Sequence, residues 1–172
     1  MNIFTKAVGI AAFGIAAFSA VPAVQAQASA SDAIVLPTNG TKEIGLAGNY
    51  HFNTPKFYSV QGLLGIFVSP VIELGGQLGV AGGDGTSAAT TVSAFADYYL
   101  SNSAGSSLLP YVGATVGYEH FSGTDSTSLG GEAGVKYFLN SNVAINAKFQ
   151  YVGARNLSGQ SDFVLGLSTF IK

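Results

Sequence analysis

Seven charged side chains within the predicted strands fall on the same side of the alternating pattern, and they have the chemistry to act together. They are Glu43, Glu73, Asp97, Glu119, Glu132, Lys136 and Lys148. Each falls on the polar side of an alternation of apolar and polar residues, and Gln77 is among the amides on that side. Because alternate side chains of a strand point to opposite faces of a sheet, these groups are expected on one face. Five acids facing two lysines predict either a hydrogen-bonded polar network or the wall of a mildly cation-preferring water path.

The segment His120-Phe121-Ser122 is a second place where chemistry could reside. A histidine can act as the base for a serine nucleophile when an acid orients its ring. Glu132, the acid downstream, falls on the opposite face from His120. The alternative is an interfacial histidine beside a loop serine, and the chain is predicted not to be an enzyme. No metal site or cofactor is predicted. His51 and His120 fall on opposite faces of different strands, and their spacing is not that of metal ligands.

Eight runs of alternating residues must position these groups, and the alternation is that of β-strands. The predicted strands span residues 42–52, 57–68, 71–81, 90–100, 109–121, 129–139, 143–155 and 162–172. Segments rich in Gly, Ser, Asn and Pro separate the runs, as turns require. Eight strands of about ten residues, joined by short connections, have the dimensions of a small antiparallel barrel.

Alternation alone does not say which face of the barrel is inside, because a soluble ligand-carrying barrel has the same pattern with the faces exchanged. Only 9% of the residues are charged, against roughly 25% in soluble chains. Six tyrosines on the apolar side lie near strand ends, with Tyr50, Tyr58, Tyr118 and Tyr151 at one rim and Tyr98 and Tyr137 at the other. Two aromatic girdles are typical of membrane barrels. The prediction is an all-β fold, an eight-stranded antiparallel up-and-down transmembrane β-barrel, in residues 42–172.

The N-terminal residues predict export. Residues 1–28 have the charge, apolar run and small-residue exit of a signal peptide, with cleavage after Ala26 or Ala28. The apolar run is shorter than the roughly 20 residues that a membrane helix needs. Residues 29–41 are predicted to be a flexible periplasmic lead-in, with residues 33–36 placed to cover the lower mouth of the barrel. An even number of strands then leaves both termini in the periplasm.

Three segments carry a resemblance to a known group. Residues 110–118 (PYVGATVGY), 130–139 (GGEAGVKYFL) and the strand over 143–151 resemble the small outer-membrane barrels of Gram-negative bacteria, the OmpA-like and opacity-like group. The resemblance implies a porin-like monomer in the outer membrane. It also implies outer-membrane lipid and lipopolysaccharide as its surroundings, and contact with the barrel-assembly machinery during insertion.

The expected role is envelope integrity or slow passive permeation of small solutes through a polar, gated lumen. His120 and Ser122 are also similar to the His-x-Ser arrangement of lipid A deacylases, so a lipid-modifying enzyme is an alternative. A surface adhesin is another alternative, although the short Gly/Ser/Thr-rich loops lack aromatic anchors. A net charge of −2 without a basic excess predicts no nucleic-acid binding.

Overall fold

The computed structural model describes residues 36–51, 57–85, 87–100, 106–154 and 157–172. The predicted signal peptide and residues 29–35 lie outside these ranges. The structure contains eight strands: β1 (Lys42–His51), β2 (Phe57–Ser69), β3 (Ile72–Gly83), β4 (Ala89–Tyr99), β5 (Leu108–Phe121), β6 (Thr124–Asn140), β7 (Val143–Ala154) and β8 (Leu157–Ile171). Each overlaps one of the predicted strands. Over the described ranges, no helix is long and apolar enough to cross a membrane.

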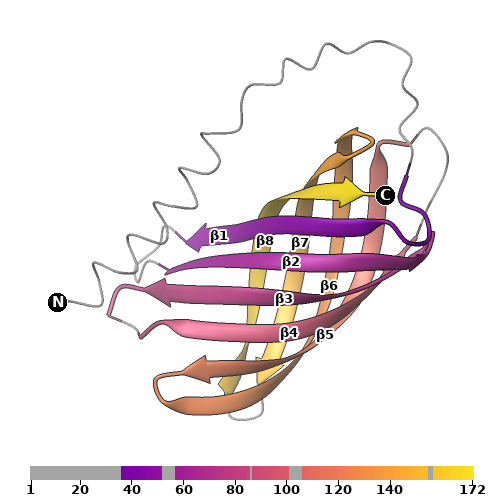
Figure 1. The fold of residues 1–172 in the computed structure, drawn as a ribbon. Coiled ribbons are helices and arrows are strands. Elements are labelled where there is room, and N and C mark those ends of the chain that lie inside the picture. Colours follow the sequence, from indigo (N-terminus) through magenta and orange to yellow (C-terminus); the bar gives the residue numbers. More distant parts are fainter. Residues whose placement is uncertain (1–35, 52–56, 86, 101–105, 155–156) are drawn as a thin grey trace. The chain divides into compact units, whose positions relative to one another are not determined.

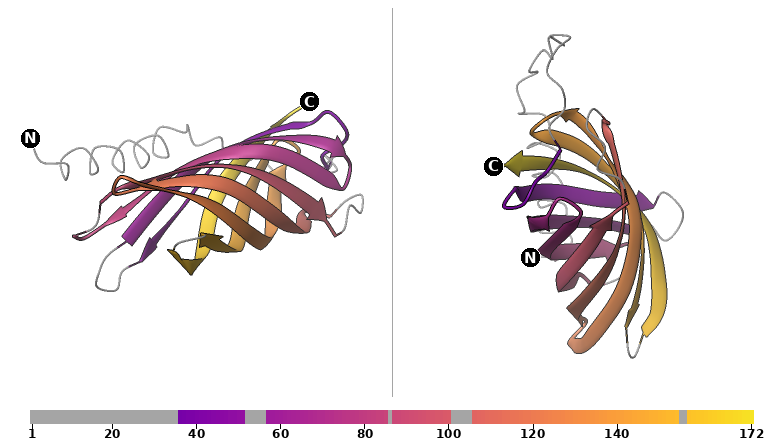
Figure 2. Two further views of the ribbon diagram at one scale, coloured as in Figure 1. Left: turned by 90° about the horizontal axis from the view of Figure 1, so that it is seen from below. Right: turned by 90° about the vertical axis from the view of Figure 1, so that its right-hand side faces the viewer.

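The strands close into one barrel in sequence order, as Figures 1 and 2 show. Every strand is antiparallel to the next, and β1 completes the ring by pairing with β8, from Lys42 opposite Ile171 to Gly48 opposite Leu165. The predicted eight-stranded antiparallel barrel is therefore confirmed. The end of the barrel where β1 begins and β8 ends is called the terminal end below, and the other is called the opposite end.

The hairpin of β5 and β6 is longer than the sequence predicted. Residues 122–128 were expected to form a polar loop, and that prediction is wrong. Only Ser122 and Gly123 turn the chain, with φ values of 49° and 79°, and pairing continues to Phe121 opposite Thr124. Two successive positive φ angles are those of a type I′ turn, whose twist suits a β-hairpin. Strand β8 likewise begins earlier, at Leu157 instead of residue 162.

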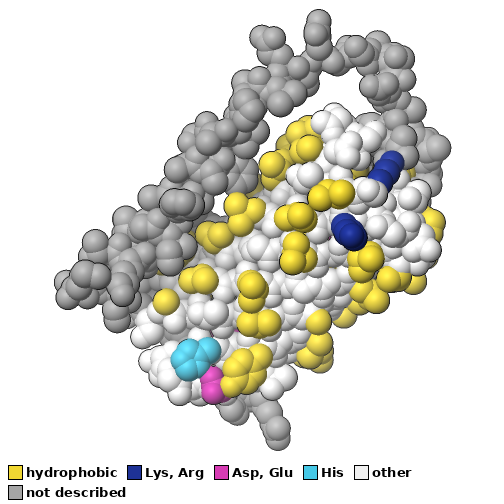
Figure 3. All heavy atoms as spheres, in the orientation of Figure 1, with side chains coloured by type: hydrophobic (Ala, Val, Ile, Leu, Met, Phe, Trp, Pro, Cys, Tyr) yellow, Lys and Arg dark blue, Asp and Glu magenta, His cyan; other side chains and the backbone are white. Residues whose placement is uncertain are grey.

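The two faces of the barrel differ as the alternation predicts. Large apolar side chains cover its outside, for example Leu64, Leu78, Leu129 and Phe163, which are 58–69% exposed. The face visible in Figure 3 carries hydrophobic side chains over its breadth and few charged ones. The buried polar side chains are on the alternate positions of the same strands. A contiguous exposed apolar surface of this kind marks a face that contacts a partner or a membrane.

Candidate functional site in the barrel lumen

The terminal end of the lumen is filled by an apolar plug. Its members come from the N-terminal approach to β1 and from six strands: Leu36, Phe67, Tyr99, Leu109, Tyr111, Phe138, Ala144 and Phe170. Ring contacts link Tyr111, Tyr99, Phe67, Phe170 and Phe138 in that order, with centroids 5.2 Å apart for Phe67 and Tyr99 and 4.9 Å apart for Phe138 and Phe170. Such tilted aromatic pairs add to the energy of burial. Gly40 N donates to Phe67 O at 2.7 Å, which holds residues 36–41 at this end.

Lys136 of β6 occupies the centre of the lumen immediately next to the plug. Its Nζ donates hydrogen bonds to Glu43 Oε2 of β1, to Glu73 Oε2 of β3 at 3.0 Å and to Tyr99 Oη of β4 at 2.6 Å. Tyr99 Oη in turn donates to Glu73 Oε2 at 2.5 Å. All four side chains are at most 2% exposed. A buried ammonium with two carboxylates and a hydroxyl joins four strands across the barrel.

A second ion pair lies beside the first. Lys148 Nζ of β7 donates to Glu132 Oε2 of β6 at 3.0 Å, and Tyr111 Oη donates to Asn146 Oδ1 at 3.0 Å. Asp97 of β4 is 4% exposed, and its Oδ1 has no hydrogen-bond partner within the described part of the chain. We call Glu43, Glu73, Asp97, Glu132, Lys136 and Lys148 the ionic layer. It holds four acids and two lysines, all buried.

Glycines on neighbouring strands make room for the acids of this layer. A Cβ placed at Gly65 would lie 1.9 Å from Glu73 Oε1, and one at Gly113 would lie 1.9 Å from Asp97 Oδ1. No side chain fits at such distances unless the carboxylate moves, and the packed lumen leaves little space for that movement. The inward glycines therefore belong to the site as much as the charges do.

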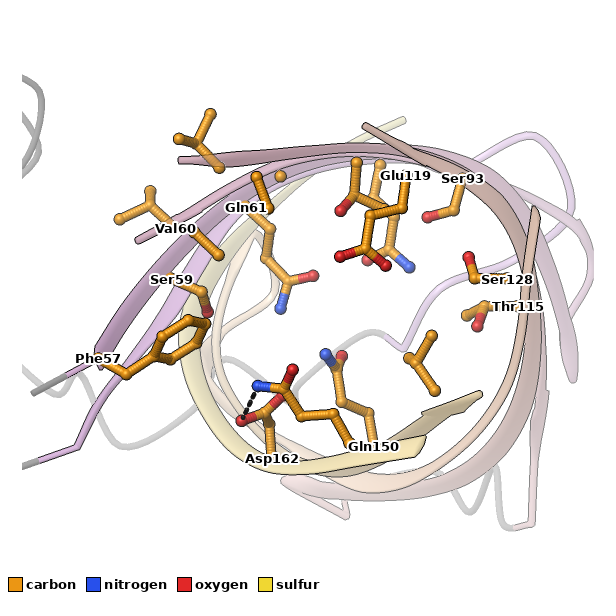
Figure 4. A pocket seen from close by; sticks show the side chains of 18 residues that line it. Phe57, Ser59, Val60, Gln61, Ser93, Thr115, Glu119, Ser128, Gln150 and Asp162 are labelled. Carbon is orange, nitrogen blue, oxygen red and sulfur yellow. Dashed lines mark hydrogen bonds between the residues drawn. The ribbon is translucent and has the colours of Figure 1, made fainter. Parts of the chain in front are cut away.

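The lumen opens toward the opposite end of the barrel. There it forms a cavity of about 510 Å³, which we call the open cavity, lined by amide and hydroxyl side chains together with apolar and small residues. Figure 4 looks into it: Gln61, Gln150, Ser93 and Thr115 lie around the ring of strands. Within the ionic layer the free space falls to about 10 Å³, in a space that Tyr111 and Lys136 help to line. That is room for about one water molecule.

The sequence grouped Glu119 with the other charges, but the structure places it apart from them. Glu119 lines the open cavity, and the six members of the ionic layer lie closer to the plug. Gln77 lines both spaces. The plug was not predicted from the sequence. The signal for it is four aromatic residues on the polar side of the alternation, at strand ends that meet at one end of an up-and-down barrel: Phe67, Tyr99, Phe138 and Phe170.

Four of the six girdle tyrosines have exposed side chains on the outer face, namely Tyr98, Tyr118, Tyr137 and Tyr151, at 46–52%. Tyr58 is half-buried and pairs with Tyr50 across β1 and β2. The side chain of Tyr50 lies outside the described part of the chain.

His120 has a different partner from the one considered in the sequence. Its Nδ1 lies 2.6 Å from Asp125 Oδ1 on the neighbouring strand, and both side chains are more than half exposed. The hydrogen bond from His120 lowers the pKa of Asp125, and a second from Tyr118 acts in the same direction. Glu132, by contrast, is buried against Lys148. Among the described residues, no group of three His, Cys, Asp or Glu side chains is arranged to hold a metal ion.

Comparison with known proteins finds no family model and no curated protein that matches the chain. Solved structures do match. The N-terminal β-barrel domain of Pseudomonas aeruginosa OprF has a TM-score of 0.59 at 19% identity, over 78% of this chain and 98% of that one. Neisserial surface protein A gives 0.58 at 17% identity, over 75% and 95%.

The outer membrane protein OprG of Pseudomonas aeruginosa gives a TM-score of 0.54 at 13% identity, over 81% of this chain and 99% of that one. The chain has the fold of a small outer-membrane β-barrel. The resemblance predicted from residues 110–151 is confirmed at the level of the fold.

Proposed function

We propose that the protein resides in a bacterial outer membrane as a closed barrel with a structural role in the envelope. The observation that carries this proposal is the filling of the lumen. The apolar plug and the ionic layer occupy its full width, and about 10 Å³ of free space remains beside Lys136. A hydrated ion or a metabolite needs far more room than one water molecule. The barrel at rest is then a barrier with a stable shape.

The membrane location is supported by the outer surface. Apolar side chains cover it, and exposed tyrosines lie toward both ends of the strands. Lipid tails would cover the apolar band and the tyrosines would lie at the two interfaces, as in other membrane barrels. Closure of the sheet through the β1–β8 pairing gives the backbone groups of every strand a partner, which lipid cannot provide. On this proposal, lipopolysaccharide and phospholipid are the main partners of the outer surface.

Slow passive permeation is a second role, favoured by the open cavity. This cavity extends from the opposite end of the barrel as far as Gln77. The ionic layer and the plug then separate it from the terminal end. A path would require movement of Lys136 away from Glu43 and Glu73 and displacement of plug side chains such as Phe67. That movement leaves buried carboxylates without a partner and is therefore rare.

Planar-bilayer recording of the purified protein tests both roles. The closed-barrel proposal expects no sustained conductance from the parent protein, with at most brief and infrequent openings. Replacing Lys136 and Lys148 by alanine removes the two ammonium groups and should increase the opening frequency. The outward substitution Phe149→Ala, also on β7, should leave it unchanged. A parent protein that conducts steadily would contradict the closed barrel, and if the alanine variants never conduct, the permeation role fails.

Location and orientation are tested in cells. The protein should sediment with outer-membrane fractions and run faster on gels when it is not heated. The chain has no cysteine, so single cysteines report accessibility. Ser122→Cys, at the tip of the β5–β6 hairpin, should react with an impermeant maleimide on intact cells, and Lys172→Cys only after permeabilisation. Recovery in a soluble fraction, or the reverse labelling pattern, would overturn the proposal.

A further inference from the structure

The geometry points to Asp97 as a proton-binding site in the lumen: its side chain carries a proton at neutral pH, and release of that proton weakens the ionic layer. Asp97 lies on β4 and is 4% exposed, and its Oδ1 has no hydrogen-bond partner within the described part of the chain. This inference goes beyond the proposed function and requires only the folded barrel. It rests on the neighbours of the carboxyl group, on the partners of the two lysines and on a route to water.

Carboxylates flank Asp97 on both sides along the sheet. On β3, Glu73 pairs directly with it, and residues that pair directly have Cβ atoms about 4.5–5.5 Å apart. On β5 its partner is Gly113, which has no side chain, and the next residue in that row is Glu132 of β6. An ionised Asp97 would therefore be the third like charge in one row of the lumen, and like charges disfavour ionisation.

The positive charges of the lumen are already paired with other acids. Lys136 Nζ pairs with the acids of β1 and β3, and Lys148 Nζ pairs with Glu132. Neither ammonium group forms an ion pair with Asp97 within the described strands. An unpaired carboxylate in a buried site costs so much free energy that the group takes up a proton instead. The protonated form is neutral and adds no charge to the three carboxylates and two ammonium groups that remain.

The other side chains around the layer do not supply a partner for an ionised Asp97. Tyr99 Oη donates its hydrogen bond to Glu73 Oε2, and Tyr111 Oη donates to Asn146 Oδ1. The buried side chains that β2 and β8 contribute to the described structure carry no charge. Each hydroxyl group is therefore directed at another acceptor, and a neutral Asp97 is the form that this arrangement accommodates.

Water can deliver the proton from one end of the barrel. Asp97 lines the small space of about 10 Å³ within the ionic layer, and Gln77 lines both that space and the open cavity. The space has room for about one water molecule, and a protonated carboxyl group has an O–H that can donate to it. The proton is then exchanged with the medium at the opposite end, because the plug fills the lumen at the terminal end.

Release of the proton adds a negative charge to the ionic layer. The two flanking carboxylates would then face a like charge. Asp97 would also compete with them for Lys136 and Lys148, which line the same small space. The ion pairs that join the strands across the lumen would weaken, so the barrel is predicted to lose stability as the pH rises.

Infrared spectroscopy of the purified protein in neutral detergent tests for the proton directly. The carbonyl stretch of a protonated carboxyl group is separate from the bands of carboxylates, and isotope labelling of aspartate shifts it for aspartate but not for glutamate. At neutral pH the unaltered protein should show a protonated carboxyl band that moves with the aspartate label. Asp84 and Asp125 are exposed, so their carboxyl groups are ionised at this pH and should give no such band.

Two variants assign the band. Asp97→Asn keeps the shape of the protonated side chain and should remove the band. Asp84→Asn is the matched control, because it makes the same change at an exposed position, and it should leave the band unchanged. Heat-dependent gel mobility establishes that each variant is folded.

The pH dependence of unfolding is a second measurement. The folded parent holds a proton that the unfolded chain releases once the pH exceeds the pKa of an exposed carboxyl group, so its unfolding equilibrium constant rises with pH. Asp97→Asn lacks this proton. Between about pH 5 and about pH 7, the unfolding constant of the parent divided by that of Asp97→Asn should increase about tenfold per pH unit. The same ratio taken with Asp84→Asn should stay constant. Urea titrations followed by circular dichroism measure both ratios.

Three outcomes would overturn the inference: no protonated aspartate band in the labelled parent at neutral pH, an unchanged band in folded Asp97→Asn, or a ratio of unfolding constants for Asp97→Asn that does not change with pH. The first uses the unaltered protein, so it stands even if the variant does not fold. None of them uses conductance, which tests the closed barrel separately.

Discussion

Asp97 on β4 lies directly opposite Gly113 on β5, and a Cβ at Gly113 would come within 1.9 Å of Asp97 Oδ1. The carboxylate occupies the space that the glycine leaves. A Cβ at Gly65 on β2 would likewise lie 1.9 Å from Oε1 of Glu73 on β3, although Gly65 pairs with Gly75 and not with Glu73. Buried acids in this lumen thus depend on the absence of a side chain on the neighbouring strand, and the pairing register fixes which glycine serves which acid.

Substitution of Gly113 by alanine should destabilise the barrel. The new methyl group forces Asp97 out of its position, and overpacking of this kind costs about 1–3 kcal/mol. Urea unfolding followed by gel mobility and circular dichroism measures the loss. The control is Gly131→Ala on β6, because a Cβ at Gly131 meets its nearest atom at an ordinary 3.7 Å. Equal stabilities of the two variants would contradict the close-approach argument.

Replacing Lys136 by methionine should be among the most damaging single changes. Methionine fills the volume but leaves Glu43 and Glu73 as buried carboxylates without their ammonium partner, which costs about 3–5 kcal/mol of unfolding free energy. Lys42→Met, at an exposed position on β1, should cost less than about 1 kcal/mol.

The same urea titration provides the decisive comparison. Adding Glu43→Gln and Glu73→Gln to the Lys136 variant should recover much of the lost stability, since it removes the unpaired charges. If the triple variant is as unstable as the single one, packing and not charge explains the loss.

Neighbouring tyrosines should respond differently to loss of the hydroxyl group. Tyr99→Phe removes the donor to Glu73 and the acceptor for Lys136 inside the lumen, so we expect a loss of about 1–3 kcal/mol. Tyr98→Phe, one residue earlier and half exposed on the outer face, should change the stability by less than half of that amount. A larger effect at Tyr98 would mean that the hydroxyl in the lumen adds little to the network.

The stability of the tip of the β5–β6 hairpin should decrease at acid pH. Because the bond from His120 lowers the pKa of Asp125, the ionised carboxylate stabilises the hairpin fully above the ordinary carboxyl pKa. This contribution is lost as the pH falls through the lowered pKa. Carbon-detected NMR titration of Asp125 should give a value below that of a free aspartate, and His120→Ala should move it upward. An unchanged value in His120→Ala would remove the histidine as the cause.

The sequence predicted the elements of this fold closely, because the signal was a period of two repeated eight times. The alternation alone predicts that Leu64 and Leu78 face outward and that Glu73 faces inward. The segment 124–128 was missed because polar residues alternate there with polar residues, so no apolar face marks the strand.

Contacts across the lumen were not predictable in the same way. Lys136 on β6 reaches Glu43 on β1 and Glu73 on β3, which are not its neighbours in the sheet. Which inward groups meet depends on the tilt and stagger of the closed barrel, and parity does not contain that information. Parity also placed Glu119 with the ionic layer, whereas its depth along the strand separates it from that layer.

The open cavity has one mouth, since the ionic layer and the plug close its inner side. It is therefore a dead end: a solute that enters must leave by the route it took. Uptake measurements on the resting barrel would therefore record exchange of solutes between the cavity and the medium on one side, and no net flux across the membrane.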